Sequence, residues 1–269
     1  MTFDVKPEGS SPAADASIHA AARHGFSAGA QTYSRGRPEY PNDVLPWLTT
    51  ELGVAAGKRV VDLGAGTGKF TKLLARTGAD VIAIEPIEAM RERLAASLPA
   101  VRALDGTAES IPLESASADT LICAQAFHWF ATDAALAEIH RVLRPGGRLG
   151  LVWNVRDESV DWVAAITAII TPYEGDAPRF HKGDWRKPFA GRHFGVPGKT
   201  VFRYEHVGTA QEVIIDRFLS VSFVAVLPAQ EKSRVADQLR ALIASHPALH
   251  DRDVIAFPYS TEAYSFARL

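Results

Sequence analysis

The sequence predicts an α/β fold in which a parallel sheet is flanked by helices, and three observations point to it. Five short apolar stretches alternate with amphipathic segments over roughly 95 residues, which is the pattern of successive βαβ units. The first stretch runs directly into the glycine-rich segment 64–68, after which a helix begins. The chain of 269 residues is also long enough to bury a sizeable core.

Each strand is predicted from a short run of apolar or β-branched residues between turn residues. In chain order, such runs occupy residues 59–63, 81–85, 101–104, 120–124, 148–153, 200–207 and 253–259. The first five alternate with helices and should therefore pair in parallel, with right-handed crossovers. A ligand of such a sheet binds beyond the carboxyl ends of the strands.

Each helix is predicted from apolar residues that recur three or four positions apart. In chain order, the helices cover roughly 42–52, 69–77, 87–97, 132–143, 160–170 and 231–245. Gly78 ends the second helix, Thr132 or Asp133 can cap the fourth, and the turn at 144–147 stops it. The segment 213–223 fits either a helix or a strand, because its periodicity does not decide between them.

The composition excludes several classes of function. Basic and acidic residues nearly balance, at 29 against 31, and form no long run of one sign, so nothing predicts binding to nucleic acid or to a membrane surface. No run of about 18 apolar residues suggests a membrane span. The single cysteine, Cys123, excludes a disulfide framework and favours a reducing cytoplasm. His181, His193 and His246 show no metal-ligand spacing with acidic partners, so no metal is predicted.

The glycine-rich segment and two nearby carboxylates narrow the choice of ligand. Lys69 stands where a dinucleotide-binding fingerprint needs its third glycine, and no phosphate-binding P-loop is present. Asp62, two residues before the first glycine, disfavours a pyrophosphate but suits a cationic or amine-bearing ligand. Glu85 ends the second strand, where a carboxylate can accept hydrogen bonds from ribose hydroxyls.

Together with three further motifs, these residues resemble the class I S-adenosylmethionine-dependent methyltransferases. The loop 105–113 is similar to that family's adenine-contacting loop, 124–129 to its segment after strand four, and 142–147 to its turn into strand five. The motifs keep the family's order and spacing over residues 58–154.

A narrower resemblance involves residues 33–41, of sequence YSRGRPEYP, the His-Trp pair at 128–129 and the closing stretch 258–264. These resemble the trans-aconitate methyltransferase-like branch of the type 11 group, whose known members often methylate small acids.

The resemblance implies a Rossmann-like, seven-stranded mixed sheet, mostly parallel with one antiparallel strand, and helices on both faces. Residues 1–24, rich in Ser, Pro, Ala and Gly, are expected to form a flexible tail before a methyltransferase domain at 25–269. Within that domain we expect an N-terminal cap at 25–57, a cofactor-binding core at 58–154, an acceptor-side elaboration at 155–225, and a closing helix and strand at 226–269.

The resemblance also assigns site residues. Those expected to bind S-adenosyl-L-methionine are Tyr33, Arg37, Asp62, Gly64, Ala65, Gly66, Gly68, Glu85, Pro86, Thr107, Ala108, Glu109, Gln125 and Ala126. Those expected to bind the acceptor are Trp129, Asn154, Arg156 and Arg217. His128 is the candidate general base, with a purely structural histidine as the alternative. A carboxylate acceptor, with a pKa of about 4, needs no base, whereas a phenol or an ammonium, with a pKa of about 10, does.

We therefore expect a cytoplasmic S-adenosylmethionine-dependent methyltransferase, monomeric or homodimeric. Its acceptor should be a small molecule, with carboxylates among the candidates, and it should bind neither nucleic acid nor membrane. Three alternatives are a catalytically silent module that holds the cofactor, a nicotinamide-dependent oxidoreductase and a nucleic-acid methyltransferase. Lys69 and Asp62 count against the oxidoreductase, and the near-neutral net charge of −2 counts against the nucleic-acid enzyme.

Overall fold

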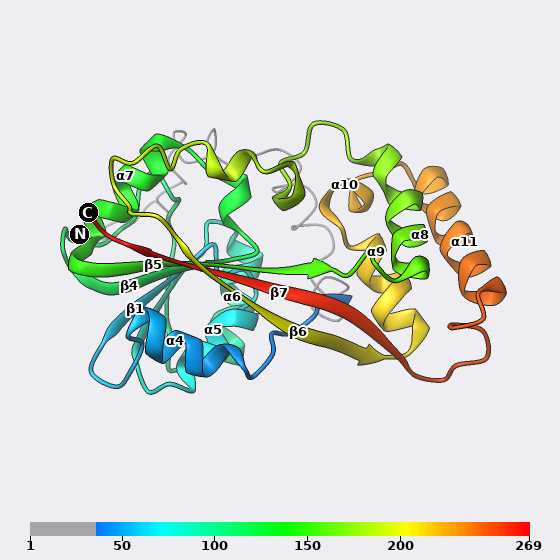
Figure 1. Cartoon of the computed structure of the whole chain (residues 1–269), viewed down its shortest axis with the longest axis horizontal. Helices are drawn as coiled ribbons and strands as arrows, with labels where there is room; N and C mark the ends of the chain where they lie inside the picture. Colours follow the sequence, from blue (N-terminus) through cyan, green and yellow to red (C-terminus); the bar gives the residue numbers. More distant parts are fainter. Residues whose placement is uncertain (1–35) are drawn as a thin grey trace, which may run out of the picture.

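The computed structural model describes residues 36–269, in which seven strands form one sheet in the order β3-β2-β1-β4-β5-β7-β6 (Figure 1). The strands are β1 (Arg59–Leu63), β2 (Asp80–Ile84), β3 (Arg102–Leu104), β4 (Ala118–Ala124), β5 (Leu143–Arg156), β6 (Gly198–Gly208) and β7 (Ile255–Ala267). Strands β1 to β5 pair in parallel, whereas β7 is antiparallel to both β5 and β6. The predicted seven-stranded mixed sheet with one antiparallel strand is confirmed.

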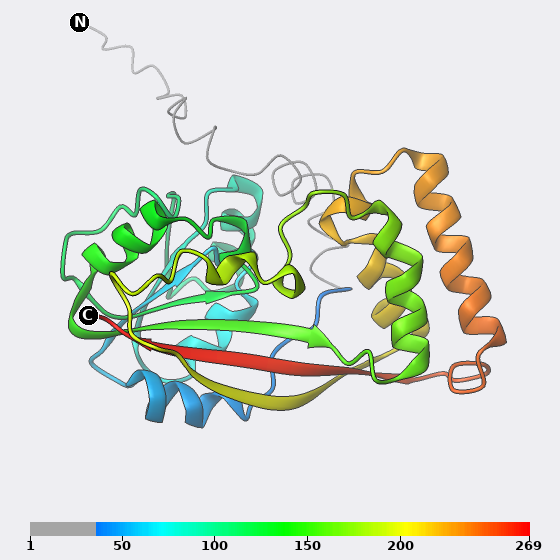
Figure 2. The ribbon, with the colours of Figure 1, turned by 45° about the horizontal axis from the view of Figure 1, so that its top comes forward.

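Helices cover both faces of this sheet (Figures 1 and 2). They are α4 (Val44–Leu52), α5 (Lys69–Ala75), α6 (Glu88–Ser97), α7 (Asp133–Val142), α8 (Asp161–Ile170), α9 (Arg217–Leu219), α10 (Ser222–Ala225) and α11 (Ala229–Ser245). Successive residues of β1 point to opposite faces, so Val60 packs with α4 and α5 while Val61 packs with α7. Thr132 caps α7, as predicted, because its hydroxyl accepts the backbone N–H of Ala135 at 3.1 Å.

Strands β5, β6 and β7 continue beyond the parallel part of the sheet toward a group of helices formed by α8 to α11 (Figure 2). A separate apolar core lies there, and Trp162, Phe218 and Phe257 are among its buried members. Helix α8 packs against α11 within this group. Strand β5 therefore belongs to both halves of the molecule.

At two stretches the structure goes beyond the sequence prediction: an ambiguous segment is helical, and a predicted strand is longer than expected. The ambiguous segment 213–223 is helical, with a π-helix at Gln211–Asp216 followed by α9 and α10. Consecutive apolar residues are buried there, which hides any period. Strand β7 runs to Ala267, well beyond its predicted end, although Pro258 and the polar Thr261 suggest a turn. Neighbours on both sides hold this stretch in the ladder.

Two further expectations concern the N-terminal region and membrane-spanning helices. The predicted tail at 1–24 and the predicted site residue Tyr33 both lie outside the described residues. Between residues 36 and 269, no helix combines the length and the apolar character needed to cross a membrane.

Candidate functional site

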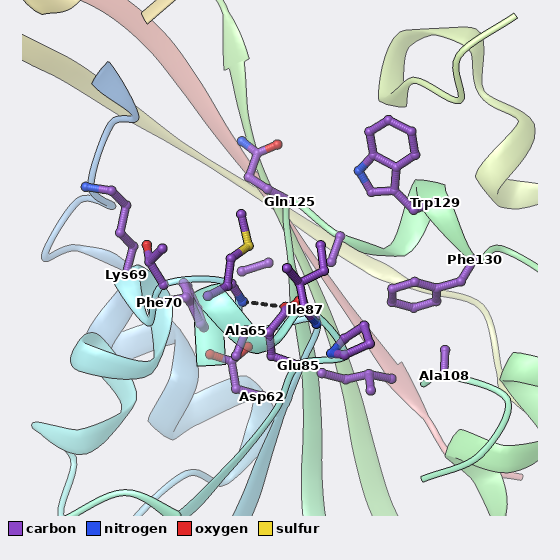
Figure 3. A pocket seen from close by; sticks show the side chains of 18 of the residues that line it. Asp62, Ala65, Lys69, Phe70, Glu85, Ile87, Ala108, Gln125, Trp129 and Phe130 are labelled. Carbon is purple, nitrogen blue, oxygen red and sulfur yellow. Dashed lines mark hydrogen bonds between the residues drawn. The ribbon is translucent and has the colours of Figure 1, made fainter. Parts of the chain in front are cut away.

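A pocket of about 1180 Å³ lies over the carboxyl ends of β1, β2 and β4, where sheets of this kind bind ligands. Its lining includes the predicted cofactor residues Arg37, Asp62, Gly64, Ala65, Gly66, Glu85, Pro86, Thr107, Ala108, Glu109, Gln125 and Ala126. Gly68 is not among the lining residues. Asp62 and Glu85 lie on one side of the pocket, and Gln125 and Trp129 on the opposite side (Figure 3).

The glycine turn between β1 and α5 shapes the floor of this pocket. Gly64, Gly66 and Gly68 have φ angles of 72°, 57° and 86°, a region that residues with side chains rarely adopt. A Cβ on Gly64 would lie 2.7 Å from the Cβ of Ala126, and one on Gly68 would lie 2.9 Å from Leu94 Cγ in α6. Gly64 therefore lets the segment after β4 approach the turn, whereas Gly68 serves the packing of α5 against α6.

Glu85 braces the turn from the end of β2. Its buried carboxylate accepts the backbone N–H of Gly66 on Oε2 at 2.8 Å and that of Ile87 on Oε1 at 3.0 Å. Each oxygen has a second lone pair with which to accept a hydroxyl from a ligand. Burial raises the pKa of Glu85 to about 7, although the two backbone hydrogen bonds act in the opposite direction.

Asp62 is fully buried beside the turn. Its Oδ2 accepts a hydrogen bond from Thr71 Oγ1 at 2.6 Å, whereas its Oδ1 has no hydrogen-bond partner among the described residues. Burial raises the pKa of Asp62 to about 7, with the Thr71 bond opposing. Because a buried carboxylate oxygen without a donor is costly, this arrangement suits a ligand that brings a polar N–H group.

Gln125 and Asn154 tie the opposite wall to the rest of the molecule. Gln125 has a φ of 56°, which is unusual for a residue with a side chain, and its Nε2 donates to the backbone oxygen of Asn154 at 3.0 Å. The Asn154 amide donates to Glu39 O at 2.8 Å and accepts from Thr261 Oγ1 at 2.6 Å. Asn154 thus links β5 to β7 and to the segment at 36–41, while its contact with an acceptor stays a prediction.

A second pocket of about 720 Å³ adjoins the first, and we call it the side chamber. It is lined by Arg37, Gln125, His128, Trp129, Trp153, Asn154, Val155, Arg156, Glu158, Arg179, Phe180, His181, Arg217 and Ser222. Five of these residues also line the first pocket: Arg37, Gln125, Trp129, Asn154 and Arg217. The structure therefore brings together the predicted acceptor residues Trp129, Asn154, Arg156 and Arg217, and it puts His128 in the side chamber.

Positive charge is crowded in the side chamber. Arg217 is 6% exposed, and its buried Nη1 has no hydrogen-bond partner within residues 36–269. Burial lowers the pKa of Arg156 and of Arg179, and neighbouring arginines lower both further. The nearest carboxylates, Glu158 to Arg156 and Glu174 to Arg179, are each 3.7 Å from the guanidinium Nε. Guanidinium groups gathered in this way suit an anionic ligand.

Sequence reasoning missed several residues of the side chamber, among them Arg179, Phe180 and His181. They belong to the stretch 172–199, which reads as loop because of its prolines and glycines. The available signal was the run of an arginine, an aromatic residue and a histidine within a loop, since binding residues are concentrated in loops that a rigid scaffold positions.

Comparison with known proteins relates this geometry to a family. Residues 61–151, from β1 into β5, match the family described as a methyltransferase domain. An uncharacterised methyltransferase of Mycobacterium tuberculosis is 43% identical over 239 residues, which cover 88% of this chain and 92% of that protein. The chain belongs to the class I S-adenosylmethionine-dependent methyltransferases. A methyltransferase-like protein of Schizosaccharomyces pombe is 37% identical to it over 241 residues, or 89% and 94% of the two chains.

Solved structures show the same fold. One, of a candidate type II methyltransferase from Anaeromyxobacter dehalogenans, is 26% identical and has a TM-score of 0.56, covering 86% of this methyltransferase and 96% of that chain. The YcgJ protein of Bacillus subtilis, at 18% identity, has a TM-score of 0.54 and covers 84% and 98%.

The cofactor of this methyltransferase is S-adenosylmethionine. We propose that the first pocket, called the cofactor pocket from here on, holds it. We propose that the unpartnered Oδ1 of Asp62 accepts from the cofactor's ammonium group and that Glu85 accepts from its ribose hydroxyls. The glycine turn, which carries no side chains at Gly64 and Gly66, would give the cofactor access to the backbone between them.

Binding of S-adenosylhomocysteine to this methyltransferase is expected to release protons near neutral pH. In the free protein the pKa values of Asp62 and Glu85 are about 7, so both carboxyls are partly protonated there. Ligand donors favour the ionised carboxylates and lower both pKa values. Affinity should therefore rise between pH 6 and pH 8, by at most about tenfold per carboxyl for each pH unit.

Calorimetry in two buffers of different ionisation enthalpy measures this proton release directly. The Asp62→Asn variant removes one of the two titrating groups, so it should release fewer protons on binding. Zero net release by the unaltered protein at pH 7 would contradict the expectation.

Proposed function

We propose that this methyltransferase transfers the methyl group of S-adenosylmethionine to a carboxylate of a small-molecule acid. The observation that carries the proposal is the side chamber, in which the buried Arg217 and the half-buried Arg37, Arg156 and Arg179 adjoin the cofactor pocket. Arginine suits a carboxylate because its planar guanidinium donates two parallel hydrogen bonds to the two oxygens.

Unused hydrogen-bond donors in the side chamber support an anionic acceptor. Arg217 Nη1 and Ser222 Oγ are buried and have no hydrogen-bond partner in the described part of the chain. Such atoms are costly in the free protein, and an anionic oxygen would satisfy them. A cationic acceptor would instead add to the positive charge around Arg156 and Arg179, which already lowers the pKa of both.

The sequence also supports a small acid. The resemblance of residues 33–41 and 128–129 to the trans-aconitate methyltransferase-like branch favours the same class of acceptor. Arg37, from the first of these motifs, lines both pockets.

The protein would contribute to this reaction by positioning the acceptor and by shielding the reacting atoms from water. When bound, S-adenosylmethionine supplies an activated methyl group, whose bond to sulfur breaks with its electron pair left on sulfur as a nucleophile bonds to carbon. Arg217, which lines both pockets, would orient the acceptor beside the cofactor. Trp129 and Gln125 lie between the two spaces and would limit the entry of water.

The test is a panel of small mono-, di- and tricarboxylic acids, each supplied beside its amide, together with methyl-labelled S-adenosylmethionine. We expect acids in the panel to yield base-labile methyl esters and equimolar S-adenosylhomocysteine, while the amides yield neither. Methylation of phenols or amines, with every acid inert, would contradict the proposal. Tight binding of S-adenosylhomocysteine without any product would favour a catalytically silent module.

A further inference from the structure

One ring nitrogen of His128 already accepts a hydrogen bond from a neighbouring side chain. His128 lies in the short turn Phe127–Trp129 after β4, and the indole Nε1–H of Trp153 donates to its Nδ1 at 3.1 Å. An indole nitrogen can only donate, so Nδ1 must hold a lone pair and cannot carry a proton. In the neutral imidazole the proton is then on Nε2, which makes this nitrogen a donor.

The surroundings of Trp153 hold this arrangement in place. Trp153 is 1% exposed, and its ring packs against Phe180 and Trp185 with centroid distances of 4.8 and 4.7 Å. Its backbone lies in β5, where it pairs with Glu262 of β7. Protonation of His128 at Nδ1, or rotation of its ring, would leave the buried indole N–H without an acceptor, which is costly. The fold thereby fixes the tautomer of His128.

The charges around His128 act in the same direction. Burial, followed by the positive charges of Arg179 and Arg37 and then by His181, holds the pKa of His128 well below its usual value. The chamber's one lining carboxylate in the described chain, Glu158, lies 3.7 Å from Arg156 rather than beside the histidine. The ring is therefore neutral at pH 7, with Nε2 protonated.

We propose that His128 is a fixed hydrogen-bond donor to the acceptor, not a general base, and that the side chamber therefore takes only acceptors whose nucleophilic oxygen is already ionised. This deepens the proposed function and rests on it. Two other polar groups that line the chamber, the guanidinium of Arg217 and the hydroxyl of Ser222, have unused donors. The reaction then needs no proton transfer: the carboxylate oxygen bonds to the methyl carbon, the methyl–sulfur bond breaks, and a neutral ester and a thioether form.

The first test reads the tautomer without any activity assay. Protein labelled with ¹⁵N at histidine is examined by two-bond ¹⁵N–¹H correlation spectra across a pH titration. The chain has 9 histidines, so the His128→Gln variant assigns the signal. We expect the Nε2–H tautomer at pH 7, with protonation only well below the usual pKa of histidine. The Nδ1–H tautomer, or a doubly protonated ring at pH 7, would overturn the proposal.

The second test separates donor from base by kinetics with the acid of highest turnover. His128→Gln keeps an N–H donor of similar reach but cannot take up a proton, so its kcat/KM should stay within about tenfold of the unaltered enzyme. His128→Leu removes the donor and should raise the KM of the acid by about 10- to 100-fold, as expected for a lost hydrogen bond to a charged group. The exposed His250→Gln serves as the matched control.

The pH profile completes the comparison. A general base at His128 would make His128→Gln lose about 10²- to 10⁴-fold in kcat and would remove an ionisation from the profile, which would overturn the proposal. Loss of that size in His128→Gln with the NMR tautomer intact would also overturn it. If the unaltered enzyme methylates no acid at all, the proposed function fails instead, and the tautomer measurement still stands separately.

Discussion

Replacing Arg179 with methionine is expected to reduce kcat/KM for the acid acceptor by about 100- to 1,000-fold, because the acid loses charge-assisted hydrogen bonds. Arg179 lines the side chamber but not the cofactor pocket. The stability gain on adding S-adenosylhomocysteine, read as a melting shift, should therefore be unchanged. Initial-rate kinetics with the best acid of the panel, beside melting curves, give both quantities.

The fold should tolerate this substitution. Arg179 leaves behind the buried Glu174, which keeps Lys182 at 3.3 Å and His181 at 3.2 Å as partners. Arg203→Met, on the exposed side of β6, is the matched control and should alter neither quantity. Full activity of Arg179→Met toward the acid would show that the arginine cluster does not bind the acceptor.

Replacing Glu85 with glutamine is expected to weaken binding of S-adenosylhomocysteine by about 10- to 150-fold, the range for one lost hydrogen bond to a charged group. The carboxylate accepts from the backbone at Gly66 and Ile87 and has lone pairs left for a ligand. An amide offers only one oxygen, so it cannot serve both backbone donors and the ribose. Titration calorimetry at pH 8, where the carboxylate of the unaltered protein is ionised, measures the loss.

Glu88→Gln is the control for this change, since Glu88 is exposed in the first turn of α6 and is not a lining residue of the cofactor pocket. An unaltered dissociation constant for Glu85→Gln would remove the ribose role from this carboxylate, leaving it as a brace for the glycine turn.

The parallel half of the fold was predictable because its signals are local. The strand at 59–63 has the predicted bounds, and the glycine turn follows it directly in the sequence. Asp62 and Glu85 could be assigned to one site because the carboxyl ends of neighbouring parallel strands meet at one edge of a sheet. No long-range information was needed for this part.

The side chamber was only partly predictable because distant segments form it. Arg179 belongs to a loop with no period, and the fold brings it into one chamber with Arg156 at the end of β5 and Arg217 in α9. The hydrogen bonds that the Asn154 amide and the His128 ring already make also depend on partners that are distant in the sequence. A sequence pattern identifies such side chains as candidates but does not tell which of their atoms are already bonded.

The length of strand β5 bears on how the acceptor can change among proteins that descend from one ancestral gene. The region shared with the methyltransferase domain family ends at residue 151, inside this strand, whereas Val155 and Arg156 at its far end line the side chamber. Substitutions downstream of the shared region can change the lining of the side chamber, while the part of the cofactor pocket that lies within residues 61–151 is preserved. The continuous strand keeps the two halves in one fixed spatial relation throughout such divergence.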